Sequence, residues 1–166
     1  MASLIALAQT AATRGEVPIA ASVLDAKGKS LSSSTYAYDG QGRKTEWRVL
    51  DAAGSAKAST TYAYEKDGPS VIEMKDIAGK VTGTIKLEYS NGKLAKCSYF
   101  GSDGLLQRYE AYAYAGERLS ALEDRRGDGS LSSKTTYEYG SLGEPVKTSE
   151  YDAANALRGY TSYEYS

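Results

Sequence analysis

The sequence contains no histidine, and it has one cysteine, one tryptophan and one phenylalanine among 166 residues. Without histidine, the chain lacks the side chain that most often serves as a general base and as a metal ligand. The single cysteine, Cys97, cannot close a disulfide within the chain. We therefore predict that the protein is not an enzyme, and that it has no catalytic residue, no metal site and no cofactor.

Long apolar runs and charge of one sign are also missing. No apolar stretch approaches the roughly 20 residues that a membrane-spanning helix needs. The apolar segment from Met1 to Ala12 lacks the basic residues that open a signal peptide. The 20 basic residues are interleaved with 21 acidic ones, and the net charge is -1. We expect no membrane span and, because there is no basic stripe, no nucleic-acid partner.

Tyrosine is the residue that the sequence has in excess, with 15 copies, and it recurs at a fixed interval. The step Tyr36-Ala37-Tyr38 returns, in full or altered, along the rest of the chain. Its second tyrosine, or the equivalent one, is Tyr38, Tyr64, Tyr89, Tyr114, Tyr139 and Tyr165, at separations of 26, 25, 25, 25 and 26 residues. A fixed interval of this length identifies a repeat protein.

Each repeat contains two turns. One turn follows the tyrosine step. The other lies at Gly28, Gly54, Gly79, Gly104, Gly129 and Asn155. Glycine and asparagine suit a turn position with positive φ. Two turns in each repeat leave room for two strands of about seven to nine residues, and short turns make successive strands antiparallel neighbours.

Strands are predicted near residues 17–25, 30–38, 44–51, 56–64, 70–76, 81–89, 93–100, 106–114, 118–124, 131–139, 145–152 and 158–165. The predicted fold is all-β: an antiparallel meander of about 12 strands. A short helix is predicted before it, because Leu4, Leu7 and Ala11 have helical spacing. We expect residues 1–16 to form a helical cap and residues 17–166 to form the tyrosine-rich β-repeat domain.

Alternation along the strands separates two faces of the sheet. Both tyrosines of each step point to one face, here called the tyrosine face. A column that recurs every 25 residues is predicted to join them: Trp47, Ile72, Cys97 and Leu122. The opposite, charged face carries Glu46, Arg48, Glu73, Lys75, Lys96 and Glu123. This pattern is typical of a half-solvated antiparallel sheet.

Three arrangements can cover the tyrosine face. The sheet can curl with the tyrosines inside, it can stay a single layer held by cross-strand tyrosine ladders, or it can pair this face with another chain. We favour a curled sheet, because 15 tyrosines are a large apolar area to leave open.

The stretch Tyr36-Ala37-Tyr38-Asp39-Gly40-Gln41-Gly42-Arg43 resembles the YD repeat of bacterial rearrangement-hotspot (Rhs) proteins and related surface and toxin proteins, whose pattern is Tyr-x-Tyr-Asp-x-x-Gly-Arg. Later units keep the interval but lose individual residues, and the resemblance covers about residues 17 to 166. It implies a β-rich shell or fibre without chemistry of its own. Five full units are too few for a large enclosing shell, so cargo encapsulation is not implied.

Residues 4–31 resemble the opening helix and first hairpin of tRNA adenosine deaminases, through Ala6-Leu7-Ala8-Gln9 and the run from Ala11 to Lys29. That family holds zinc with a His-x-Glu and a Pro-Cys-x-x-Cys motif. This chain has neither motif, so the missing ligands exclude deaminase activity. Either a deaminase-like fragment was joined to the repeats, or the likeness is chance in a segment whose Val-Leu-Asp-Ala-x-Gly already belongs to the repeat.

The tyrosine steps are the candidate binding surface. Its residues are Tyr36, Tyr38, Tyr62, Tyr64, Tyr112, Tyr114, Tyr137 and Tyr139. Such rings can stack on a sugar or an extended peptide, but their return in every unit favours a ladder inside the core. The carboxylate pairs Glu110 with Asp124 and Glu73 with Asp76 come without a cleft-forming loop. Cys97 has no histidine to activate it and is predicted to be a buried packing residue.

From these patterns we expect a non-enzymatic structural or interaction protein, in the bacterial periplasm, on the cell surface or secreted. The alternative is a glycan- or peptide-binding module that uses the tyrosine face or a sheet edge. A degenerate nucleotide deaminase ranks last. The partner is expected to be a protein or a glycan. The last strand, Arg158 to Ser166, carries little charge, so self-association through edge strands is also expected.

Overall fold

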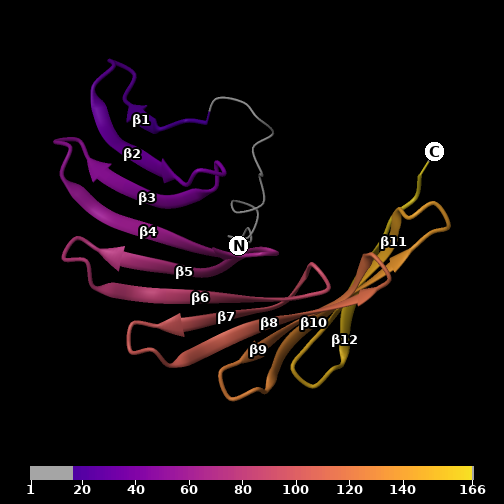
Figure 1. Cartoon of the computed structure of the whole chain (residues 1–166). Coiled ribbons are helices and arrows are strands. Elements are labelled where there is room, and N and C mark those ends of the chain that lie inside the picture. Colours follow the sequence, from indigo (N-terminus) through magenta and orange to yellow (C-terminus); the bar gives the residue numbers. More distant parts are fainter. Residues whose placement is uncertain (1–16, 166) are drawn as a thin grey trace. The chain divides into compact units, whose positions relative to one another are not determined.

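The computed structural model describes residues 17–165, and every regular element in this range is a β-strand (Figure 1). The strands are β1 (Ala20–Leu24), β2 (Ser30–Tyr38), β3 (Lys44–Asp51), β4 (Ala56–Glu65), β5 (Gly68–Asp76), β6 (Val81–Ser90), β7 (Lys93–Gly101), β8 (Leu106–Ala115), β9 (Arg118–Arg126), β10 (Leu131–Tyr139), β11 (Pro145–Tyr151) and β12 (Leu157–Ser162). Neighbours in the sequence are neighbours in one 12-stranded sheet. The predicted all-β antiparallel meander is confirmed, and the predicted helix at residues 1–16 lies outside the described residues.

The observed strands agree with the predicted ones within a few residues, and the largest differences are at the two end strands. β1 begins at Ala20 rather than near residue 17. β12 ends at Ser162, although the amide of Tyr163 still donates a hydrogen bond to the carbonyl of Val146 at 3.0 Å. The interval between repeats therefore predicted strand positions well.

The chain divides into two compact units by its contacts, and the division falls within β6. The first unit ends at Thr84 and the second begins at Ile85. Every described strand belongs to the one sheet, as the single-layer form of the prediction requires. The curled form stays a prediction. Over residues 17–165 there is no helix of the length and apolar character that crossing a membrane requires.

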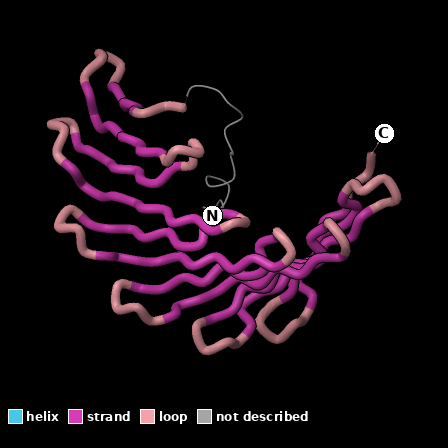
Figure 2. Tube along the Cα trace, in the orientation of Figure 1, coloured by secondary structure: helices cyan, strands magenta, loops and turns pink. Residues whose placement is uncertain are grey.

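Turns join the successive strands (Figure 2). Their hydrogen bonds and backbone angles distinguish two kinds. In the first kind, represented by Asp51, the aspartate carbonyl accepts a hydrogen bond from Gly54 at 3.0 Å and its amide donates to Ser55 at 2.9 Å. The Asp51 carboxylate also accepts the amides of Ala53 and Ser55, both at 2.9 Å. Gly54 has φ 81° and completes a bulge that shifts the register of the adjoining pair. The predicted turn glycines all have positive φ, and Asn155 replaces glycine with φ 59°.

The second kind of turn follows the tyrosine step in the middle repeats. Between β6 and β7, Asn91 and Gly92 have φ 52° and 75°. Two successive positive φ angles define a type I′ turn, which matches the right-handed twist of the strands that it joins. Each strand that carries a tyrosine step is therefore followed directly by an adjacent antiparallel strand.

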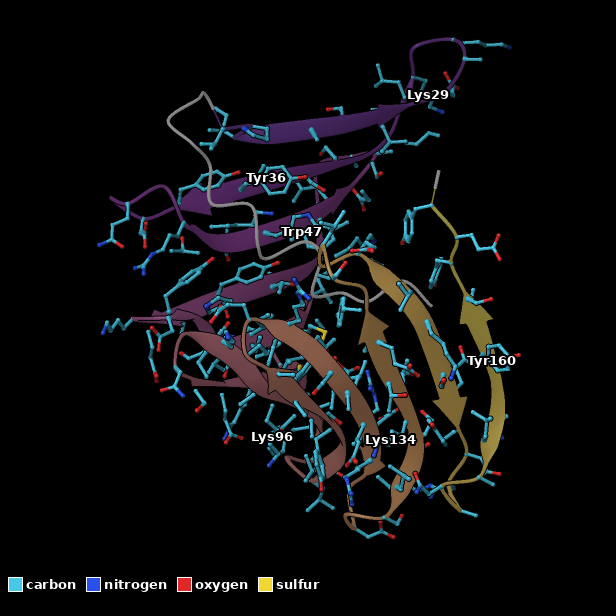
Figure 3. The ribbon with its side chains drawn as sticks, turned by 90° about the vertical axis from the view of Figure 1, so that its right-hand side faces the viewer. Lys29, Tyr36, Trp47, Lys96, Lys134 and Tyr160 are labelled. Carbon is cyan, nitrogen blue, oxygen red and sulfur yellow. The ribbon has the colours of Figure 1, made fainter. Side chains whose placement is uncertain are left out.

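The register confirms the predicted faces. Tyr36 lies opposite Trp47, Tyr62 opposite Ile72 and Tyr112 opposite Leu122. Directly opposed residues share a face of a sheet, so the predicted column belongs to the tyrosine face, and Figure 3 labels Tyr36 and Trp47 on neighbouring strands. Ion pairs hold the charged face together: Arg48 with Glu46, Lys75 with Glu73, Lys96 with Glu88, Lys134 with Glu123, and Lys147 with Glu138.

Few apolar side chains are fully buried in the described part of the chain. The buried ones are Ile85, Leu87, Leu94 and Cys97, all on β6 and β7. Turn residues such as Leu142 remain exposed, at 91%. A sheet of this kind gains its stability from pairs of side chains on adjacent strands rather than from a thick interior.

Candidate interaction surface

The second tyrosine of each step is hydrogen-bonded to the repeat before it. In five units its hydroxyl donates to the backbone carbonyl that lies 20 residues earlier. The pairs are Tyr38 with Pro18 (2.9 Å), Tyr64 with Lys44 (2.8 Å), Tyr114 with Leu94 (3.1 Å), Tyr139 with Leu119 (2.8 Å) and Tyr165 with Pro145 (2.7 Å). We call these the hydroxyl–carbonyl bonds. Each bond ties the end of a strand that carries the tyrosine step to the beginning of the strand before it in the sheet.

The rings of three of these second tyrosines are also covered by a cation. The guanidinium of Arg43 lies over the Tyr64 ring, 4.6 Å from its centroid. Lys93 lies over Tyr114 at 5.5 Å and Arg118 over Tyr139 at 5.6 Å. In each case the cation directly precedes the residue whose carbonyl accepts the tyrosine hydroxyl. The repeat thus occupies both the ring face and the hydroxyl of these side chains, through a cation–π contact and a hydrogen bond.

Three of the first tyrosines are less engaged through their hydroxyls, although Lys44 lies over the Tyr36 ring, 5.0 Å from its centroid. Within residues 17–165, the hydroxyls of Tyr36, Tyr62 and Tyr137 donate no hydrogen bond to another protein group. Burial, reinforced by neighbouring tyrosines, raises the pKa of Tyr62 and of Tyr137. The Tyr62 and Tyr137 phenols are therefore partly desolvated without a protein hydrogen bond at the hydroxyl, unlike the second tyrosines.

The predicted binding surface accordingly separates into two sets. Tyr38, Tyr64, Tyr114 and Tyr139 make the hydroxyl–carbonyl bonds. Tyr36, Tyr62 and Tyr137 leave their hydroxyls unpaired, and Tyr112 forms a hydrogen bond of a different kind. Only the first set has a structural hydrogen bond that recurs with the repeat.

Tyr112 belongs to a polar cluster on the tyrosine face of the second unit, centred on Glu110. The Glu110 carboxylate accepts the hydroxyl of Tyr112 at 2.5 Å and that of Tyr99 at 3.2 Å. It also accepts Nη1 of Arg108 at 2.9 Å. The Arg108 guanidinium lies over the Tyr99 ring at 3.7 Å. Three donors thus satisfy one carboxylate whose side chain is only 15% exposed, and one of them, Arg108, also supplies the opposite charge.

The same cluster changes the ionisation of its neighbours. Burial first, and then the hydrogen bond to Glu110, raises the pKa of Tyr112. Burial and the Cys97 thiol raise the pKa of Tyr99. Burial also raises the pKa of Cys97, which is 0% exposed. In all three groups the raised pKa favours the neutral form.

The two candidate carboxylate pairs differ in whether their side chains share a face of the sheet. Glu110 and Asp124 lie directly opposite each other on β8 and β9, and Arg108 bridges them, with its Nη1 3.5 Å from Asp124 Oδ1. Glu73 lies opposite Thr61 and Asp76 opposite Ala58, so this second pair points to opposite faces of the sheet. Residues 17–165 contain no group of three or more acidic or cysteine side chains arranged to hold a metal ion.

Sequence reasoning missed two members of the cluster, Tyr99 and Arg108. The alternation of Arg108, Glu110 and Tyr112 along one strand is a signal that they share a face. The partner on β7 depends on strand register, which places Tyr99 opposite Arg108. The prediction that charged residues lie on one face and tyrosines on the other does not apply to Arg108 and Glu110, which lie on the tyrosine face.

Fold and surface together define a class: antiparallel β-repeats in which a tyrosine of each unit is hydrogen-bonded to the unit before it. No protein-family model matches the chain, and no curated protein matches it either. Among solved structures, it is similar to TcdB2-TccC3, with a TM-score of 0.50 and 16% identity over 86% of this chain and 10% of that chain. This chain therefore spans about a tenth of that protein's length, and at this identity the likeness shows the fold alone.

Two further similarities are weaker. A porin-like protein from Bacteroides uniformis has a TM-score of 0.43 and 19% identity, over 80% of this chain and 54% of that chain. The Tc holotoxin pore of Photorhabdus luminescens has a TM-score of 0.38 and 14% identity, over 86% of this chain and 9% of that chain.

Proposed function

We propose that this chain is a non-enzymatic structural module, a β-repeat segment that serves as a spacer or interaction surface in the bacterial envelope or outside the cell. The observation that carries the proposal is the recurrence of the hydroxyl–carbonyl bond, between 2.7 and 3.1 Å, in five units. A feature that recurs along the repeats builds the sheet, whereas a binding site needs to occur only once.

Two other observations support this function. The connections are tight turns, which offer little loop material from which to build an active site. The fold is also found in TcdB2-TccC3, and the resemblance to YD repeats implies the same kind of scaffold. We infer that the chain contributes rigid, solvated sheet to an extracellular or envelope assembly whose other members are proteins.

The double variant Tyr62→Ser/Tyr64→Ser tests the structural role. It removes one first and one second tyrosine of the same step, together with the Tyr64 bond to Lys44. We expect a loss of about 3–5 kcal/mol in the free energy of unfolding, because two large half-buried rings are deleted, measured by urea denaturation. Ala63→Ser, between them on the opposite face and exposed, is the matched control and is expected to change stability by less than about 0.5 kcal/mol. An unchanged stability of the double variant would contradict the structural role.

A second candidate function is the binding of a glycan or peptide at the first tyrosines. The unpaired hydroxyls of Tyr36 and Tyr62 favour it, because a sugar needs both an aromatic surface and hydrogen-bond partners. Trp47, the only tryptophan, lies opposite Tyr36 and reports on this surface. Titration with soluble oligosaccharides is expected to shift Trp47 fluorescence if they bind here. A response that persists in Tyr36→Ala/Tyr62→Ala would place the ligand elsewhere.

A further inference from the structure

We propose that copies of this chain associate head to tail, with β1 of one copy pairing antiparallel with β12 of the next. The occupant of each edge is a second copy of this chain. The inference deepens the proposed structural function and rests on it, because it specifies how a repeat module would extend a sheet.

The two strands at the ends of the sheet order are unusual in their exposure. Every residue of β1 and of β12 is exposed. Their apolar side chains are among the most accessible in the described chain: Val23 at 56%, Leu24 at 54%, Leu157 at 56% and Tyr160 at 64%. β1 has no charged residue and β12 has one, Arg158. Soluble sheets usually protect such edges with charge or proline, because an open edge is a template for another strand.

Repeat equivalence predicts which residues would face each other. β1 occupies the same place in its repeat as β3, and β12 the same place as β2, as the turn and tyrosine intervals show. In the chain itself, β2 and β3 pair Ser34 with Val49 and Tyr36 with Trp47. The equivalent pairs between two copies are Thr161 with Val23, and Tyr163 with Ala21. The new interface would thus copy one that already exists within the chain.

Backbone orientation agrees with this register independently. The amide of Tyr163 points toward β11, where it bonds the carbonyl of Val146 at 3.0 Å. Because backbone groups alternate sides along a strand, those of Ser162 point outward. The carbonyl of Ile19 points toward β2 and accepts the amide of Tyr36 at 3.0 Å, so the groups of Ser22 also point outward. The predicted register places Ser162 directly opposite Ser22, where the two can exchange hydrogen bonds.

The register gives a cross-linking test. Thr161 and Val23 would form a pair without mutual hydrogen bonds, whose Cα atoms lie about 4.5 Å apart, within reach of a disulfide. We expect Val23→Cys/Thr161→Cys, oxidised mildly at high protein concentration, to give a ladder of dimers, trimers and longer species on a non-reducing gel. The wild-type chain should give none, because its only cysteine is 0% exposed.

Controls separate this arrangement from the alternatives. Ser22→Cys/Thr161→Cys, which places the thiols on opposite faces, should cross-link at least about tenfold more slowly if the register is correct. Dimers from Val23→Cys alone or from Thr161→Cys alone would mean pairing of identical edges. A disulfide within one monomer would mean that the chain joins its own ends. Each of these results, or no cross-linking at all, would overturn the head-to-tail proposal.

A blocking variant provides a second measurement without added thiols. Ser22→Pro removes an outward amide without taking a donor from the β1–β2 ladder, and Ser22→Thr is its matched control. Sedimentation velocity over a range of concentrations should show association for wild type and Ser22→Thr, weakened at least about tenfold in Ser22→Pro. Equal association of all three would contradict the proposal. Because these variants leave the hydroxyl–carbonyl bonds in place, their outcome is independent of the Tyr62→Ser/Tyr64→Ser test.

Discussion

The two units fill the same six positions of the tyrosine face in different ways. In the first unit these are Trp47, Val49, Ala58, Thr60, Tyr62 and Met74. In the second unit, 50 residues later, they are Cys97, Tyr99, Arg108, Glu110, Tyr112 and Asp124. The strand pairing is the same: Trp47 lies opposite Thr60, and Cys97 lies opposite Glu110.

The difference is a redistribution of volume and polarity. The first unit places its largest ring at Trp47 and surrounds it with small residues at 58 and 60. The second unit places a small, fully buried Cys97 there and moves the bulk to Tyr99 and Arg108. The indole Nε1 of Trp47 is buried without a hydrogen bond, and so is Oδ1 of Asp124 in the second unit. The Glu110 carboxylate, in contrast, accepts hydrogen bonds from Tyr99, Arg108 and Tyr112. One backbone thus accepts an apolar or a polar filling, as long as the volume fits.

Removing the Glu110 carboxylate should produce the largest difference in stability loss between the two units. Glu110→Ala leaves Arg108 and two phenols without their shared acceptor, and we expect a loss of about 2–3 kcal/mol in unfolding free energy. The equivalent change in the first unit, Thr60→Ala, should lose less than about 1 kcal/mol. Urea denaturation of both variants measures the difference. Equal losses would mean that the Glu110 cluster adds nothing to the stability of the second unit.

The cluster should also be visible in an alkaline titration. Burial raises the folded-state pKa of Tyr62, Tyr99 and Tyr112 above the ordinary value of 10.0. A raised pKa favours the neutral phenol in the folded state, so this contribution to stability is complete below pH 10 and is lost as pH rises through the folded-state values. Near-ultraviolet absorbance should show the last phenols ionising only with unfolding. Glu110→Gln removes a negative neighbour and should advance ionisation in the second unit, while Thr60→Gln should not.

Local turn chemistry explains why so much of the fold was predictable. Gly54 and Asn155 mark positions where the backbone needs positive φ, and the interval between such residues fixed the strand positions. Alternation along β8 places Glu110 on the same face as Tyr112, two residues later. The Tyr99 donor was not predictable, because Tyr99 reaches Glu110 only through the register between β7 and β8. Which tyrosine hydroxyl donates to a backbone carbonyl also depends on how neighbouring strands are aligned.

The smallest expected effect concerns the hydroxyl–carbonyl bond, which both units contain. Tyr139→Phe removes the hydroxyl that donates to Leu119 at 2.8 Å, and we expect a loss of about 1 kcal/mol. Tyr137→Phe, two residues earlier, removes an unpaired hydroxyl and should be neutral within about 0.5 kcal/mol. The pair Tyr64→Phe and Tyr62→Phe should repeat this contrast in the first unit, because Tyr64 makes the equivalent bond to Lys44. If the first tyrosines lost as much stability as the second ones, the hydroxyl–carbonyl bond would not be the common element, and the two units would share only their turns.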